Sequence, residues 1–127
     1  MTPGFEGGYD SALSYLFSKR RMGMKYGLER IRGLLRAMGN PESSFRTVHV
    51  VGTNGKGTTT AILAETATRL GIRTGRFTSP HLLDYRERVS VDGEWIPPDA
   101  VMRFLQLFGD DIESLSATFF EVTTALA

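Results

Sequence analysis

The stretch TVHVVGTNGKGT, residues 47–58, decides the fold of this chain, and a threonine-rich segment follows it directly. Residues 47–51 form a short, mostly β-branched run with turn residues on both sides, which predicts a buried strand. Residues 58–70 predict a helix that ends at Gly71, and residues 73–78 predict a second strand. Strand, loop, helix and strand in this order are typical of a βαβ unit, in which the two strands are parallel.

The glycine-rich loop between the first strand and the helix has the composition of a phosphate-binding turn. Glycines let backbone N–H groups converge on a phosphate, and the following helix adds free N–H groups and a partial positive charge. Lys56 supplies a compact cation for the β and γ phosphates. We therefore predict an α/β fold of the P-loop NTPase type, a mainly parallel sheet flanked by helices. The predicted ATP-binding residues are Gly52, Thr53, Asn54, Gly55, Lys56, Gly57, Thr58 and Thr59.

The loop departs from the common pattern G-x-x-x-x-G-K-[ST] in two ways. Gly52 and Gly55 lie closer together than that pattern requires, and Gly57 stands where a hydroxyl residue is usual. A glycine-rich turn without a ligand is the alternative interpretation. The βαβ context, the central Lys56 and the run of threonines favour phosphate binding, with these three glycines forming the turn.

The remaining elements are predicted from periodicity and turn residues. Apolar residues recur at helical spacing on both sides of a glycine-containing, basic connector at residues 20–26, and Asp92-Gly93 is typical of a two-residue hairpin turn. The predictions are helices over residues 10–18 and 27–38, a hairpin over residues 88–96, a helix from Pro97 and a final helical element over residues 118–127.

Composition and charge exclude several classes of protein. The chain has 127 residues and a formal net charge of +1, so there is no electrostatic case for nucleic acid or an anionic membrane. It has no cysteine and no apolar run of the ~18–20 residues that a bilayer requires, and we expect it to be cytoplasmic. The basic run at residues 19–21 is interpreted as a solvated helix end.

Further motifs accompany the phosphate loop, in a fixed order along the chain. GTNGKGT at residues 52–58 closely resembles the loop of folylpolyglutamate synthase and dihydrofolate synthase, in the Mur ligase superfamily. GLERI at residues 27–31 resembles the early helix of that family. TSPHL at residues 78–82, with the later ERV, resembles its loop after the second strand, and TFFE at residues 118–121 resembles its pterin-site segment. The resemblance covers about residue 13 to the end.

The resemblance implies an ATP-dependent ligase that joins glutamate to folate or dihydropteroate through an acyl phosphate, with Mg²⁺, in folate and one-carbon metabolism. Residues 9–127 then correspond to the N-terminal part of an ATP-binding Mur-ligase-like domain, without the remainder of that domain and the second domain, and residues 1–8 are expected to be disordered. This part alone is expected to be inactive, and the complete protein monomeric. The alternatives are a peptidoglycan-precursor Mur ligase and a nucleotide-binding fragment without chemistry of its own.

Individual roles follow from the same resemblance. Lys56 is implied as the catalytic charge stabiliser, and Ser79 and Thr58 as Mg²⁺ ligands, although Ser79 could instead form a turn and Thr58 cap its own helix. Arg88 could equally be solvated or ion-paired, and Phe119 is expected in the core. The implied folate or pteroate contacts are Gly23, Met24, Lys25, Tyr26, His81, Arg88, Thr118, Phe120 and Glu121.

Overall fold

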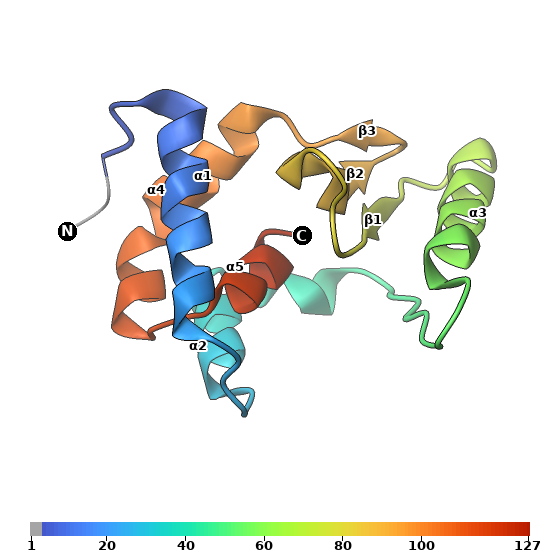
Figure 1. The fold of residues 1–127 in the computed structure, drawn as a ribbon. Helices are drawn as coiled ribbons and strands as arrows, with labels where there is room; N and C mark the ends of the chain where they lie inside the picture. Colours follow the sequence, from blue (N-terminus) through green and yellow to red (C-terminus); the bar gives the residue numbers. More distant parts are fainter. Residues whose placement is uncertain (1–3) are drawn as a thin grey trace. The chain divides into compact units, whose positions relative to one another are not determined.

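The computed structural model describes residues 4–127 and divides the chain into two compact units (Figure 1). The first unit holds the chain up to Arg46 together with Pro98–Leu126, and the second holds Thr47–Pro97. Disorder was expected over residues 1–8, and residues 1–3 of that range lie outside the described residues. The predicted phosphate loop, residues 52–58, belongs to the second unit, whereas residues 20–26 belong to the first.

The first unit is a bundle of helices, and the predicted helices are present in it. Helix α1 packs on α4, and α2 packs on both α4 and α5. The faces that meet carry leucine, isoleucine and valine at helical spacing, and Leu16, Leu34, Leu105 and Ile112 are completely buried. The elements are α1 (Gly8–Ser18), η1 (Lys19–Met22), α2 (Glu29–Ala37), η2 (Pro41–Ser44), α4 (Pro98–Ser114) and α5 (Phe119–Leu126).

The basic run after α1 is not a fully solvated helix end. Lys19 is only 8% exposed, and its ammonium forms an ion pair with Glu113 of α4. The Tyr15 hydroxyl donates to the same carboxylate at 2.6 Å, and burial together with this carboxylate raises the pKa of Tyr15. Arg20 lies over the ring of Phe119. The interpretation from charge alone was therefore wrong for Lys19, because a long aliphatic stem can be buried when its head group finds a carboxylate.

The second unit combines one helix with a three-stranded antiparallel sheet in the order β1-β2-β3. Gly75 pairs with Val91 across β1 and β2, and Ser90 pairs with Trp95 across β2 and β3. The expected hairpin is confirmed, with positive φ angles at Asp92 (51°) and Gly93 (85°) in its turn. The elements are α3 (Lys56–Arg69), β1 (Gly75–Phe77), η3 (Tyr85–Arg88), β2 (Val89–Val91) and β3 (Glu94–Trp95).

The expected parallel pairing is not present among the described residues. Residues 47–51 form no strand, and the side chains of Val48 and Val51 are 78% and 75% exposed. The segment that was expected to be the second strand shortens to β1 and pairs antiparallel with β2. The physical reason is that a strand exists only with a partner ladder, and residues 47–51 find none in this part of the chain.

Among residues 4–127, no helix combines the length and the apolar character that a membrane crossing needs.

Candidate functional site

The glycine-rich loop leads into α3 in a conformation that exposes the start of the helix. Gly55 is the N-cap residue with φ = 75°, and no side chain caps α3, so Thr58 does not have the capping role that the sequence left open. The left-handed conformation of Gly55 is one that residues with a Cβ rarely adopt. The first N–H groups of a helix lack acceptors within it, and residues 52–59 are all exposed. The loop therefore offers unpaired donors and the positive end of a helix dipole to an anion.

Lys56 is the first residue of α3, two residues earlier than the predicted helix start. Its ammonium bends back over the loop and donates to the carbonyl oxygen of Gly52 at 2.5 Å. Gly57 lies in the first turn of the helix and not in the preceding turn, so only Gly52 and Gly55 have positive φ angles here. A Cβ at Gly57 would meet nothing within 4 Å, so the space beside the first helical turn is open.

The hydroxyl residues assigned to Mg²⁺ both lie in the second unit and are exposed. Thr58 belongs to the first turn of α3, and Ser79 follows β1 in the segment after Phe77. Among residues 4–127 no group of three or more histidine or acidic side chains is arranged to hold a metal ion. Hydroxyl oxygens fit Mg²⁺ as single protein ligands, because this ion commonly completes its octahedron with phosphate oxygens and water.

The predicted substrate residues of the second unit, His81 and Arg88, are brought together. The Nε of Arg88 donates to Nδ1 of His81 at 2.7 Å, and the His81 ring packs edge-on against Tyr85. Arg88 is 5% exposed, so solvent exposure, one of its alternatives, is wrong. His81 fixes its own loop through this contact, and Arg88 contributes a buried positive charge beside it.

Glu87 holds the same loop from its other side. Its carboxylate accepts hydrogen bonds from the backbone N–H groups of Leu82, Leu83 and Asp84 at 3.1, 2.8 and 2.5 Å. The N–H groups of Asp84, Leu83 and Leu82 keep the pKa of Glu87 below its usual value. The leucines at the loop tip are 88% and 95% exposed. The backbone is thus fixed while an apolar tip remains accessible.

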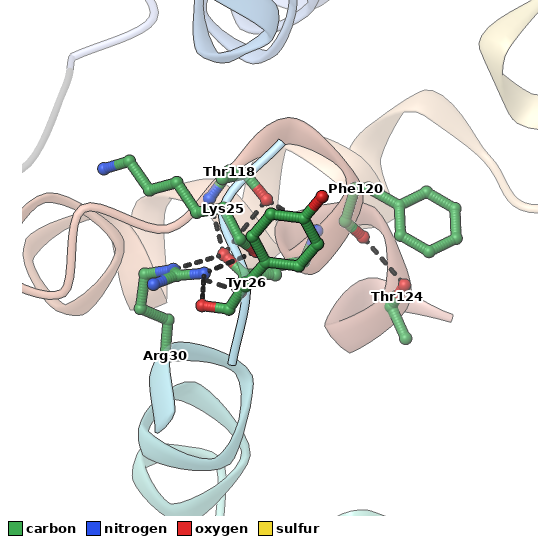
Figure 2. Close-up of polar contacts among 7 residues, drawn as sticks. Lys25, Tyr26, Arg30, Thr118, Phe120 and Thr124 are labelled. Carbon is green, nitrogen blue, oxygen red and sulfur yellow. Dashed lines mark hydrogen bonds and ion pairs between the residues drawn. The ribbon is translucent and has the colours of Figure 1, made fainter. Parts of the chain in front are cut away.

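In the first unit, Arg30 joins several of the predicted substrate residues (Figure 2). Its Nε donates to the Glu121 carboxylate at 3.1 and 3.0 Å, and its Nη2 donates to the carbonyl oxygens of Lys25 and Tyr26 at 2.9 and 3.2 Å. Glu121 also accepts from the N–H and hydroxyl of Thr118, at 2.9 and 3.0 Å, at the start of α5. The pattern Thr-x-x-Glu before an apolar run is the signature of a helix capping box.

Sequence reasoning missed Arg30, although it lies inside the GLERI motif. Nothing in a single sequence indicates that a residue near the start of α2 reaches the start of α5. The predicted residues near Arg30 differ in the exposure of their side chains. Met24 and Tyr26 are 86% and 91% exposed, whereas Phe119 is 7% exposed and stacks on Phe17. The expected core position of Phe119 is confirmed, and Phe120, at 54% exposed, is the accessible aromatic residue of α5.

The carboxylate of Glu121 is held in its charged form. Burial acts to raise its pKa, but the hydrogen bonds from Thr118 and the Arg30 guanidinium outweigh this, and the net pKa is lowered. A carboxyl whose pKa is lower in the folded state stabilises that state above its unfolded pKa. The stabilisation is lost as the pH falls through the folded pKa.

Glu121→Gln is expected to lower the free energy of unfolding at pH 7 by about 2 kcal/mol, because charged hydrogen bonds are replaced and Arg30 loses its counter-ion. The loss should shrink as the pH falls below 4.5, the ordinary pKa of a glutamate side chain, and through the lower pKa of Glu121 in the folded protein, where the parent protonates the same group. Urea unfolding at pH 7, 5 and 3 measures this, with Glu42→Gln on the exposed η2 as the control. Equal pH dependence in parent and Glu121→Gln proteins would show that Glu121 makes no linked contribution.

Sequence and structure comparisons relate the chain to known proteins. A probable bifunctional folylpolyglutamate synthase/dihydropteroate synthase of Haloferax volcanii is 40% identical over 124 residues, which is 94% of this chain and 15% of that protein. The dihydrofolate synthase/folylpolyglutamate synthase of Bacillus subtilis is 34% identical over 125 residues, which is 94% of this chain and 29% of that protein. No protein-family model matches the chain.

A solved complex of a folylpolyglutamate synthase (FPGS) with AMPPCP and folate superimposes on the chain with a TM-score of 0.83 at 32% sequence identity. The superposition covers 94% of this chain and 31% of that structure. The chain therefore spans less than a third of the length of each of these proteins.

Proposed function

The homologues and structural neighbours of this chain are folylpolyglutamate and dihydrofolate synthases, and we propose that it serves the ATP-dependent joining of glutamate to folate or dihydropteroate. The observation that carries the proposal is the uncapped start of α3, with Gly55 left-handed and Lys56 in the first helical position. A neighbour with this fold is a complex with AMPPCP, an analogue of ATP, and folate. A peptidoglycan-precursor ligase is less well supported, because Gly57 follows the lysine where that branch usually has threonine.

The proposed reaction transfers the γ-phosphoryl group of ATP to a carboxylate oxygen of the folate-type substrate. A new P–O bond forms, the bond to the β-phosphate breaks, and ADP leaves. The amine of glutamate then attacks the acyl carbon and loses a proton, and inorganic phosphate departs to leave an amide. The protein must neutralise two anions that approach each other, the carboxylate and the triphosphate.

In this mechanism the loop from Gly52 to Thr59 holds the phosphates through backbone N–H groups. The Lys56 ammonium releases the Gly52 carbonyl oxygen, to which it donates, and turns to the β and γ phosphates. Its ammonium then stabilises charge that develops on the transferred group. In the first unit, Gly23, Met24, Lys25, Tyr26, Thr118, Phe120 and Glu121 are assigned to the folate side, and in the second unit, His81 and Arg88.

Mg²⁺, when bound, would neutralise phosphate charge, and Ser79 and Thr58 are the residues proposed to hold it. Ser79→Ala is expected to raise the Mg²⁺ concentration for half-maximal rate in the complete enzyme several-fold. The exposed position of Ser79 should leave folding unchanged. A titration of the initial rate with Mg²⁺ is the measurement, and Ser14→Ala, on the exposed side of α1, is the control. An unchanged Mg²⁺ requirement would leave Ser79 as a turn residue.

In the complete, monomeric protein we propose that residues 47–51 and 73–78 pair as parallel strands of a Mur-ligase-like central sheet. The exposed Val48 and Val51 would then be buried within that sheet and beneath its flanking helices.

The chain of 127 residues alone is expected to bind ATP weakly and to form no amide product. Phosphoryl transfer requires both anions and the metal to be positioned together, and the relatives are at least three times longer. The assay combines the chain with ATP, Mg²⁺, glutamate and either dihydropteroate or tetrahydrofolate, and measures ADP and product. Turnover of ~1 per second, an ordinary enzyme rate, would contradict this expectation. Failure of AMPPCP to bind even to the complete protein would contradict the proposed function itself.

A further inference from the structure

We propose that Arg30 is a positioning residue, which holds the backbone at Lys25 and Tyr26 against the start of α5 and so presents their side chains to a folate-type substrate. The proposal rests on the function proposed above, and it assigns a role to a residue that does not itself contact substrate. Figure 2 shows Arg30 at the centre of the contacts that connect α2, the 25–26 segment and α5.

The guanidinium of Arg30 has the geometry that this bridging role needs. Its Nε faces both oxygens of Glu121, and its Nη2 faces the carbonyl oxygens of Lys25 and Tyr26. The side chains of Arg30 and Glu121 are only 18% and 12% exposed, so water screens their ion pair poorly. Arginine can satisfy several acceptors at once because its N–H donors are fixed in a plane, which a lysine ammonium cannot reproduce.

The segment that Arg30 holds has little other support. Residues 23–28 form no helix or strand, and their side chains are exposed. Tyr26 in particular is 91% exposed, while its carbonyl oxygen is fixed by Arg30. A segment held by its carbonyl oxygens and free at its side chains is suited to contact a ligand without first having to become ordered.

Glu121 belongs to the same network of hydrogen bonds. Its Oε2 accepts from the Thr118 N–H, the Thr118 hydroxyl and Arg30, and its Oε1 accepts from Arg30. A carboxylate oxygen offers about two acceptor directions, so these contacts fully engage Oε2, while Oε1 shares the Arg30 N–H. Glu121 therefore acts on substrate through Arg30 and the 25–26 backbone, as the anchor on which the guanidinium is oriented.

Trypsin provides a direct test, because cleavage after Lys25 requires the carbonyl oxygen that Arg30 holds to enter the oxyanion hole of the protease. In the 127-residue chain, Arg30→Gln is expected to accelerate cleavage of the Lys25–Tyr26 bond at least about tenfold. The Arg46–Thr47 bond, with Arg46 exposed, is the internal control and should be cut at an unchanged rate. Arg36→Gln, an exposed position on the same helix, should alter neither bond.

Peptide mass spectrometry over time measures both bonds in one digest. An unchanged rate at Lys25–Tyr26 in Arg30→Gln would overturn the proposal, and so would equal acceleration at both bonds, which indicates general loosening. Arg30→Lys keeps the positive charge but loses the planar guanidinium. Its rate of cleavage at Lys25–Tyr26 should therefore stay close to that of Arg30→Gln. Full rescue by lysine would also overturn the bridging role.

Protection of the Lys25–Tyr26 bond by folate tests the role of Arg30 in substrate presentation. Saturating folate should slow cleavage of Lys25–Tyr26 in the parent chain and leave Arg46–Thr47 unaffected. Arg30→Gln should need at least about tenfold more folate for half-maximal protection. An equal folate requirement in the two proteins would overturn the role in substrate presentation. A different outcome separates the two proposals. If folate does not protect the parent chain, but Arg30→Gln still accelerates cleavage of Lys25–Tyr26 without folate, the proposed function is contradicted. The result would still support Arg30 as the residue that holds the 25–26 backbone.

Discussion

Lys56→Ala in the complete enzyme is expected to reduce turnover at least about 100-fold, equivalent to ~2.7 kcal/mol of transition-state stabilisation. The reason is electrostatic: an ammonium at the first position of α3 is the nearest cation that the loop itself offers to the phosphates. Because the transferred group becomes more strongly stabilised as it leaves ADP, the loss should appear mainly in kcat.

The structure indicates that this substitution will not disturb folding. Lys56 is exposed, and its hydrogen bond to the Gly52 carbonyl oxygen lies within the loop. Steady-state rates with ATP and folate as varied substrates measure the effect, and a thermal melt checks the fold. Arg69→Ala at the other end of α3, where the side chain is 79% exposed and pairs with Glu65, is the control. Activity of Lys56→Ala within about threefold of the parent would remove Lys56 from the mechanism.

Leu105→Ala is expected to lower the free energy of unfolding of the first unit by about 3 kcal/mol. Leu105 is completely buried on α4, where α1 and α2 also pack, and truncation leaves a cavity that a close-packed bundle cannot refill. The first unit also carries the Arg30 contacts, so its unfolding should release the 25–26 segment as well.

Leu107, two residues further along α4 and 66% exposed, gives a matched control. Leu107→Ala should change the free energy of unfolding by less than about 0.5 kcal/mol. Urea unfolding followed by circular dichroism measures both variants. A Leu105→Ala effect no larger than that of Leu107→Ala would show that the packing of α4 on α1 and α2 does not stabilise the unit.

Features that depend on near neighbours in the chain could be predicted from the sequence. Helical periodicity, with turn residues between the periodic segments, predicted the positions of α1, α2, α4 and α5, with shifts of one or two residues at some ends. The Asp92-Gly93 turn was predicted because only a few residue types tolerate positive φ at successive positions. The phosphate loop was predicted for the same reason, since its glycines and its lysine lie within one turn of chain.

The candidate site was predicted in its parts but not in its connections. Thr118 and Glu121 form a local capping box, which a pattern can reveal. Arg30 reaches Glu121 across 91 positions of sequence, and the ion pair of Lys19 with Glu113 spans 94. A charged residue in a sequence gives no indication of a distant partner, so Lys19 was expected in solvent and Arg30 received no role.

By itself, the sequence determined which segments are helical, where the hairpin turns and which glycine-rich turn leads into α3, because each depends on backbone preferences within a few residues. The tertiary structure alone decided which strands pair: within residues 4–127, β1 pairs antiparallel with β2 and residues 47–51 pair with no strand. It also decided that Arg30 pairs with Glu121 and Lys19 with Glu113, partners that lie 91 and 94 positions apart in the chain. The reason is that strand pairing and buried ion pairs gain their free energy from groups far apart in the chain, whose proximity only the packed core establishes.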